Sequence, residues 1–247
     1  MKANQYWIGG IHAVTELLRQ RPGAVQELLV QDQRKDKRMQ ALRDLAANAG
    51  LRVQVVERSE LEKFAGEGHQ GVAALVINDS VELGEKELLV LLDQISQPLL
   101  LVLDGVTDPH NLGACLRSAD AAGVDAVIVP RDNAVGLNAT VQKVASGAAE
   151  TVNFVVVTNL ARCLEALKQR GIWLVGTSDK ADTALYAQDL TGPLAIVMGS
   201  EGDGLRRLTR EACDYLVAIP MAGEVSSLNV SVATGVTLFE AVRQRRK

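Results

Sequence analysis

At 247 residues and 47% hydrophobic content, the chain is long enough to bury a sizeable core in one domain or two. The net charge of −4 argues against a protein that coats nucleic acid non-specifically, because that binding comes from phosphate neutralisation, but it allows an enzyme that acts on a specific RNA. No apolar run approaches the roughly 18 residues of a membrane span, and residues 1–10 lack the apolar core of a signal peptide, so we expect a soluble cytoplasmic protein.

The first 77 residues predict a compact α/β domain. Residues 10–18 are typical of an opening helix, and short apolar strands then alternate with helices. The predicted strands cover residues 25–31, 51–56 and 72–77, and the predicted helices cover residues 35–49 and 59–64. The loop at residues 66–71 has three glycines, which would let its backbone approach another molecule, although a plain flexible turn explains them equally well.

Residues 78–97 form an acidic segment that we expect to be a partly helical linker. It separates the domain of residues 1–77 from a second domain of residues 98–247. The second domain alternates strands and helices again, with apolar strands predicted at 99–103, 126–129, 152–157, 172–176, 194–198 and 215–219. Near-continuous apolar strands separated by helices predict a parallel sheet that is covered on both faces. Such sheets bind their ligands at the carboxyl ends of the strands.

The cysteines and histidines predict neither a disulfide framework nor a metal site. The three cysteines lie far apart, and none forms a CxxC pair. The three histidines are equally scattered, so no spacing typical of metal ligands occurs. We therefore expect a protein without a bound metal.

A polar segment follows the predicted strand at 99–103. Pro109 and Asn111 mark the start of a helix from which Arg117 projects. Gly113 lies one turn before Arg117 on the same face, where a missing side chain would let a substrate approach. The planar guanidinium of Arg117 suits a phosphate, although a surface salt bridge is an equally good interpretation.

A glycine-rich segment follows the predicted strand at 194–198. Its glycines at 199, 202 and 204 have the order G-x-x-G-x-G, whereas dinucleotide-binding loops have G-x-G-x-x-G. Glu201 would also repel a pyrophosphate, but it suits a hydroxyl or amine donor. The glycine order and the charge of Glu201 therefore disfavour a dinucleotide site.

The third polar segment follows the predicted strand at 215–219, which Pro220 ends. Ser226 or Ser227 is expected to cap a helix whose first turn carries Asn229. An ordinary cap needs one such residue, and this junction has several. The segment therefore indicates a site for a polar ligand where a strand turns into a helix.

Together, these three segments resemble the three motifs of the SpoU/TrmH branch of the SPOUT RNA 2′-O-ribose methyltransferases, in the same order and spacing. They read Asn111-x-Gly-x-x-x-Arg117, Gly199-x-Glu201-x-x-Gly204-Leu205 and Ile219-Pro-Met-x-Gly-x-x-x-Ser-Leu-Asn-Val-Ser231. Near the N-terminus, Gly10-Ile-His-Ala-Val14 and Gly68-His-Gln-Gly71 further resemble the members that methylate guanosine in bacterial 23S rRNA. The resemblance covers almost the whole chain.

This resemblance implies S-adenosylmethionine as the methyl donor and an RNA substrate. It also implies an N-terminal RNA-binding domain like ribosomal protein L30e, and a C-terminal SPOUT domain whose parallel sheet contains a deep trefoil knot. Connections are normally unknotted, so the residue pattern alone predicts an ordinary doubly wound sheet. Dimerisation of two copies through the knotted domain is implied as well.

The resemblance also implies roles for individual residues. The positions that match cofactor contacts are Gly199, Ile219 and Leu228, with Met221 and Ser227 as their neighbours. The positions that match the reaction site are Asn111, Arg117, Glu201 and Asn229. Because a guanidinium with a pKa above about 12 is a poor general base, we interpret Arg117 as an electrostatic group that binds phosphate and stabilises the developing alkoxide. The other three would hydrogen-bond the ribose and Arg117, and a side chain at Gly199 would occupy ligand space.

The substrate and two rival functions stay open at this stage. The resemblance points to a guanosine in the peptidyl-transferase P loop of 23S rRNA, with tRNA as the alternative substrate. One rival is a catalytically inactive RNA-binding assembly protein of the same fold, which the intact polar motifs disfavour. The other is a nicotinamide-dependent enzyme, which the glycine order disfavours.

Overall fold

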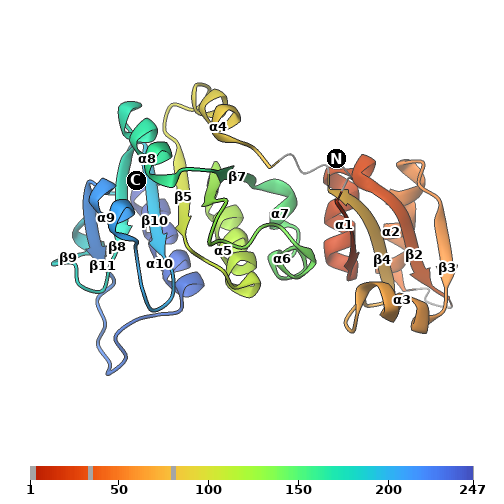
Figure 1. The fold of residues 1–247 in the computed structure, drawn as a ribbon. Helices are drawn as coiled ribbons and strands as arrows, with labels where there is room; N and C mark the ends of the chain where they lie inside the picture. The colour runs from red at the N-terminus through yellow and green to blue at the C-terminus, as the bar shows by residue number, and fades with distance from the viewer. Residues whose placement is uncertain (1–3, 33–35, 79–81, 247) are drawn as a thin grey trace. The chain divides into compact units, whose positions relative to one another are not determined.

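The computed structural model describes residues 4–32, 36–78 and 82–246, and these fall into two compact units (Figure 1). The first unit contains the described residues before Glu82 together with Leu137–Thr151, and the second contains Glu82–Gly136 and the described residues from Val152 onward. The segment Leu137–Thr151 lies within the range that the sequence assigned to the second domain, although its contacts are with the first unit.

A four-stranded sheet with the order β1-β4-β2-β3 organises the first unit. Its strands are β1 (Asn4–Gly9), β2 (Val25–Gln31), β3 (Val53–Val56) and β4 (Val72–Asn78). β4 pairs antiparallel with β1 and β2, whereas β2 and β3 are parallel. The three predicted strands are confirmed. β1 was not predicted, because its polar and aromatic start lacks the apolar run that marks the other strands.

The helices of the first unit cover the two sheet faces unequally. They are α1 (Ile11–Gln20), α2 (Lys37–Asn48), α3 (Arg58–Ala65), α6 (Ala139–Ala145) and α7 (Ala148–Thr151), with a short 3-10 turn at Pro22–Ala24. α1 and α2 bury their apolar sides in the larger core on one face, and α3 packs on the other. The predicted helix at 35–49 is confirmed from Lys37 onward. Its expected first residue, Lys35, lies outside the described residues, and Asp36 caps the helix.

A partly buried polar cluster ties α7 to the rest of the first unit. The Arg21 guanidinium donates a hydrogen bond to the Glu150 carboxylate at 2.8 Å, and the Tyr6 hydroxyl lies 3.5 Å from its other oxygen. Burial raises the pKa of Glu150, and the charge of Arg21 opposes that rise. Burial and then the neighbouring Glu150 charge raise the pKa of Tyr6.

A seven-stranded sheet with the order β7-β6-β5-β10-β8-β11-β9 organises the second unit, and all its neighbouring strands are parallel. Its strands are β5 (Leu99–Asp104), β6 (Ala126–Pro130), β7 (Asn153–Val157), β8 (Trp173–Thr177), β9 (Thr183–Ala184), β10 (Leu194–Gly199) and β11 (Tyr215–Ala218). The predicted parallel sheet is confirmed. β9 is the added strand, and its two residues are too few for a periodic pattern.

Helices cover both faces of this sheet. They are α4 (Glu85–Leu92), α5 (Pro109–Ala122), α8 (Leu160–Gln169), α9 (Arg207–Ala212) and α10 (Val230–Arg245), with a 3-10 turn at Leu185–Ala187. α4 and α8 pack into one core, which includes Leu100 and Val102 of β5, whereas α5 and α10 pack against each other. Leu101 and Leu103, the alternate residues of β5, are also fully buried. Because the residues that face each side of the sheet are all buried, the sequence of β5 is a continuous apolar run.

Parallel pairing brings the polar segments of the three motifs to one edge of the sheet. β10 lies directly beside β5, with Gly199 in register with Asp104 at the carboxyl ends of the two strands. β11 ends at the same edge, two strands away from β10. The fold therefore gathers segments that are about 100 residues apart in the sequence at the position where parallel sheets bind ligands.

Candidate functional site

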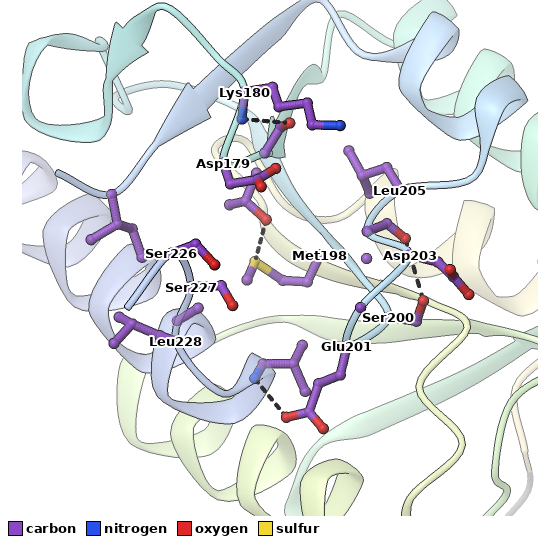
Figure 2. A pocket seen from close by; sticks show the side chains of 18 of the residues that line it. Asp179, Lys180, Met198, Ser200, Glu201, Asp203, Leu205, Ser226, Ser227 and Leu228 are labelled. Carbon is purple, nitrogen blue, oxygen red and sulfur yellow. Dashed lines mark hydrogen bonds between the residues drawn. The ribbon is translucent and has the colours of Figure 1, made fainter. Parts of the chain in front are cut away.

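A cavity of about 640 Å³ opens at the carboxyl edge of the second unit's sheet (Figure 2). Its walls come from the end of β10, the glycine-rich loop after it, and the segment between β11 and α10. All five predicted cofactor positions line it, namely Gly199, Ile219, Met221, Ser227 and Leu228. The volume lies within the range of about 300–1,000 Å³ that is usual for small-molecule sites.

One wall of the cavity was missed by the sequence analysis. Thr177, Ser178, Asp179 and Lys180 form the wall that follows β8. The Thr177 hydroxyl contacts the Met198 sulfur at 3.5 Å, and the Lys180 backbone N–H donates to the Ser178 hydroxyl at 3.2 Å (Figure 2). The rule that ligands bind at strand carboxyl ends could have found this segment, because it follows a predicted strand.

Backbone geometry explains the glycines of the loop after β10. Gly202 and Gly204 have φ angles of 87° and 69°, a region that side chains disfavour. The backbone groups of Ser200 and Gly204 exchange two hydrogen bonds of 3.1 Å, which close the loop into a tight turn. Glycine is needed here for the shape of the turn.

Residue 199 is glycine for a different reason from the expected one, which was that a side chain there would occupy ligand space. A Cβ atom added at Gly199 would overlap the backbone carbonyl group of Gly204 and the backbone nitrogen of Leu205. The missing side chain therefore makes room for the loop's own backbone, and a larger residue would collide with protein before it reached any ligand space. Gly199 still lines the cavity with its backbone.

Three of the four predicted reaction-site residues form one hydrogen-bonded group. The Asn229 side-chain amide donates to the side-chain oxygen of Asn111 at 2.9 Å and also to the Glu201 carboxylate. The same oxygen of Glu201 accepts from the Val230 backbone N–H at 3.3 Å, as the dashed line in Figure 2 marks. The Glu201 carboxylate thus lies at the N-terminus of α10, where the helix dipole favours a negative charge.

Asn229 is also the residue that caps α10, so the expectation that Ser226 or Ser227 caps the helix is wrong. The side-chain oxygen of Asn229 accepts from the Ser231 backbone N–H at 2.9 Å and from the Ser231 hydroxyl at 2.6 Å. Ser226 and Ser227 stay outside the helix and line the cavity. Serine and asparagine are about equally good caps, so the residue types alone could not choose between the two starts.

Arg117 stands apart from this group. Its side chain is exposed on α5 and, among the described residues, has no hydrogen-bond or ion-pair partner and does not line the cavity. The hydrogen bonds that Arg117 was expected to donate to Asn111, Glu201 and Asn229 are therefore not formed within the described part of the chain. The alternative interpretation, in which Arg117 forms a surface salt bridge, is not supported either, because no acidic side chain pairs with Arg117 among the described residues.

Family comparisons match both units. The model of the SpoU rRNA Methylase family matches residues 98–239, and a model described as RNA 2'-O ribose methyltransferase substrate binding matches residues 7–80. The chain is 59% identical over 237 residues to the 23S rRNA (guanosine-2'-O-)-methyltransferase RlmB of Pseudomonas aeruginosa, which covers 96% of this chain and 95% of that protein. It is 58% identical over 240 residues to the protein of the same name from Shewanella oneidensis, with 97% of each chain covered.

Solved structures show the same architecture. The SpoU methyltransferase AviRb from Streptomyces viridochromogenes, in complex with the cofactor AdoMet, superposes with a TM-score of 0.79 at 26% identity and covers 98% of this chain and 91% of its own. A crystal structure of an RNA 2'-O ribose methyltransferase superposes with a TM-score of 0.81 at 29% identity, covering 99% and 90% of the two chains.

Proposed function

This chain belongs to the SpoU rRNA methylase family, and we propose that it transfers a methyl group from S-adenosylmethionine to the ribose 2′-oxygen of a guanosine in 23S rRNA. The observation that carries this proposal is the near end-to-end match, at 59% identity, to a relative named for that activity. The location of the guanosine in the peptidyl-transferase P loop stays a prediction, as does the trefoil knot.

The cavity suits the proposed cofactor. It is large enough for a nucleoside with an amino-acid tail, and its walls combine exposed loop backbone with the apolar side chains of Ile219, Met221 and Leu228. S-adenosylmethionine supplies its methyl group as a sulfonium substituent that an oxygen nucleophile can displace. The described residues contain no cluster of three or more side chains that could hold a metal ion, and the proposal involves none.

Glu201 and Asn229 line the cavity, Asn111 is buried behind them, and the hydrogen-bonded group leaves two polar atoms for a substrate. Asn229 uses both its amide hydrogens and its oxygen within the protein, so its side chain is held in one orientation. One Glu201 oxygen accepts from Asn229 and Val230, and the other oxygen is open to a donor. The Asn111 amide accepts through its oxygen, and its nitrogen remains a donor. We assign Glu201 to accept from a ribose hydroxyl and Asn111 to donate to a ribose oxygen.

Arg117 is assigned to the RNA phosphate. An exposed guanidinium without a protein partner in the described part of the chain is available to a substrate, and its planar fork suits phosphate oxygens. A permanent positive charge beside the reacting ribose would stabilise the alkoxide as the 2′-oxygen loses its proton. Holding this oxygen in line with the leaving sulfur supplies much of the rate, because positioning alone can lower a barrier by roughly 7–11 kcal/mol.

The remaining parts of the proposal concern organisation and partners. We assign RNA binding to residues 1–77 and catalysis to residues 98–247. Residues 78–97 join the two, and helix α4 within them packs into the core of the second unit. A homodimer through the second domain is supported by Val232 and Phe239, which lie seven residues apart on α10 and are 51% and 50% exposed. No helix in the described part of the chain could cross a membrane. We infer a cytoplasmic location from the proposed rRNA substrate.

The rival functions lack a supporting observation in the structure. A dinucleotide-binding loop opens a helix that holds the pyrophosphate, whereas the helix α9 after this glycine-rich loop has only six residues. An inactive assembly protein would not need the Asn229 amide to orient both Asn111 and Glu201 by hydrogen bonds. tRNA remains the alternative substrate.

The test is methyl transfer in vitro from labelled S-adenosylmethionine to separate transcripts of 23S rRNA and tRNA, followed by mapping of the bond that resists alkaline hydrolysis. We expect one 2′-O-methylguanosine in 23S rRNA and no label in tRNA. Label in tRNA alone would establish the alternative substrate. Cofactor binding without transfer to either RNA would support the inactive assembly protein.

A further inference from the structure

Two aromatic side chains stack on the surface of the first unit. Trp7 of β1 and Phe64 of α3 have ring centroids 4.6 Å apart and ring planes inclined by 30°. Trp7 is partly buried in the small cluster beneath α3, whereas the Phe64 side chain is 43% exposed. One ring of the pair therefore rests on the protein, and the other presents surface to solvent.

The pair stands at the edge of an open part of the sheet. α1 and α2 bury one sheet face, and the short helix α3 packs on the other. The strand register places Leu75 opposite Trp7 and Glu27 opposite Leu75, so all three lie on the face that α3 shares. Leu75 is partly exposed and Glu27 is exposed. Beyond the aromatic pair, this face is thus accessible within the unit.

A constrained glycine loop and two lysines border the pair. Residues 66–71 follow α3, and the Gln70 side chain fixes this loop by accepting from the Ile11 backbone N–H at 3.3 Å. The Lys143 ammonium donates to the Glu67 carbonyl at 3.2 Å, and the side chains of Lys143 and Lys63 are exposed. One positive charge therefore directly precedes Phe64 in the chain, and the other contacts the loop that follows it.

We propose that the exposed face of the Trp7–Phe64 pair stacks on an unpaired nucleobase of the RNA substrate, with Lys63 and Lys143 near the adjoining phosphates. The proposal rests on the proposed function in taking the substrate to be RNA. Proteins recognise RNA loops by stacking splayed bases on aromatic rings, and such stacking tolerates any base. The model for RNA 2'-O ribose methyltransferase substrate binding matches residues 7–80, a range that contains both rings.

RNA fits this surface better than a protein partner does. The aromatic pair is small. Its neighbours on the sheet face are the partly exposed Leu75 and the exposed Gln5 and Glu27, and two exposed lysines lie on or beside the segment around Phe64. A stable protein interface would need a much larger apolar centre. A flat ring with two nearby lysine ammonium groups matches one base and its phosphates.

The test measures RNA binding by the full-length chain through the fluorescence of Trp7. The chain has two tryptophans, and Trp173→Phe removes the other, which lies in the second unit. In that background, Phe64→Ala, Phe64→Leu and Phe64→Tyr are titrated with an unmodified 23S rRNA transcript and with inorganic polyphosphate at matched salt. Tyr186→Ala is the control, because Tyr186 is an aromatic residue of the second unit that is 56% exposed.

We expect the transcript to quench Trp7 fluorescence and to bind roughly tenfold more weakly to Phe64→Ala and Phe64→Leu. Phe64→Tyr and Tyr186→Ala should bind like the parent, and polyphosphate should bind all variants equally. Phe64→Leu keeps apolar packing, so it tests the ring even if Phe64→Ala unfolds.

Equal RNA affinity of Phe64→Leu and Phe64→Tyr would overturn the proposal. A change of oligomeric state in Phe64→Leu, measured by analytical ultracentrifugation, would also overturn it and assign the pair to a protein contact. These affinities do not depend on turnover. An RNA that binds through Phe64 without being methylated would therefore contradict the proposed function and leave the stacking site standing.

Discussion

The buried carboxylate of Asp104 binds Arg206 across 102 residues of sequence. Asp104 ends β5 and is fully buried. One of its oxygens accepts from the Arg206 backbone N–H at 3.0 Å, and the other accepts from the guanidinium Nε at 2.5 Å. Arg206 directly follows the glycine-rich loop that carries Glu201. The pair therefore fastens the loop of the second motif to the strand that precedes the first.

Removal of the Arg206 side chain should destabilise the protein. Arg206→Ala leaves a buried carboxylate with only its backbone partner, and we expect the free energy of unfolding to fall by about 1–3 kcal/mol. Urea denaturation measures it. The control is Arg207→Ala, because Arg207 pairs with Glu211 on the exposed surface of α9 and its loss should cost less than about 1 kcal/mol. Equal losses for the two variants would mean that the buried pair does not hold the loop.

The network around Glu201 should matter for turnover more than for stability. Asn229→Ser keeps an N-cap for α10 but loses the amide that donates to Asn111 and Glu201. We expect unchanged thermal unfolding, retained cofactor binding and a kcat lowered by roughly 100-fold. Glu201→Ala should lower kcat at least as much. A purely structural role would appear instead as a lower unfolding temperature with unchanged kcat.

Arg117 should be dispensable for folding and necessary for methyl transfer. Arg117→Ala removes an exposed side chain without a protein partner in the described structure, so unfolding and S-adenosylmethionine binding should not change. Loss of the phosphate contact and of alkoxide stabilisation should lower single-turnover transfer by roughly 100- to 1,000-fold. Arg117→Lys should recover only part of this rate, because lysine lacks the planar fork. Near-wild-type turnover of Arg117→Ala would refute the assigned role.

Gly199→Ala should be destabilising even without ligand. Its methyl group would overlap the backbone of Gly204 and Leu205, and overpacking of this kind costs about 1–3 kcal/mol. Calorimetric unfolding of the ligand-free protein measures this cost. Gly23→Ala is the control, since a Cβ at Gly23 would meet no atom within 4 Å. If Gly199→Ala weakens cofactor affinity without lowering stability, the close approach of the loop backbone is not the reason that residue 199 is glycine.

The buried thiols of Cys115 and Cys163 and the partly buried thiol of Cys213 should make the free energy of unfolding fall at alkaline pH. Burial raises the pKa of Cys115 from an ordinary value of 9.0 to about 11, and it raises the pKa values of Cys163 and Cys213 to about 12. The folded state holds these protons more tightly than the unfolded state does. The free energy of unfolding should therefore be unaffected well below pH 9 and fall as pH rises from 9 towards 11, by about 1.4 kcal/mol per pH unit for each thiol.

Urea denaturation between pH 8 and pH 11 checks this expectation. Replacing the three cysteines by alanine should make the slope of stability against pH shallower, whatever the variant's absolute stability. An identical slope in the variant would show that other groups, such as Tyr6, are responsible for the alkaline loss.

Local sequence patterns determined much of this protein. The apolar runs predicted the parallel sheet of the second unit, because strands buried on both faces need apolar residues at every position. The polar segments after three of those strands predicted the site, because parallel strands bring their carboxyl ends to one edge. The motifs within these segments indicated the family.

Only the tertiary structure decided which of these residues meet. Strand order places β10 beside β5, and this pairing of distant segments has no local signature. It brings Asn111 within hydrogen-bond distance of Asn229, which is 118 residues away, and leaves Arg117 outside that group. It also decides that Asn229 caps α10 and that Gly199 makes room for its own loop. Hydrophobic periodicity in the sequence indicates whether a residue is buried. The residues that it contacts depend on packing between segments that are distant in the sequence.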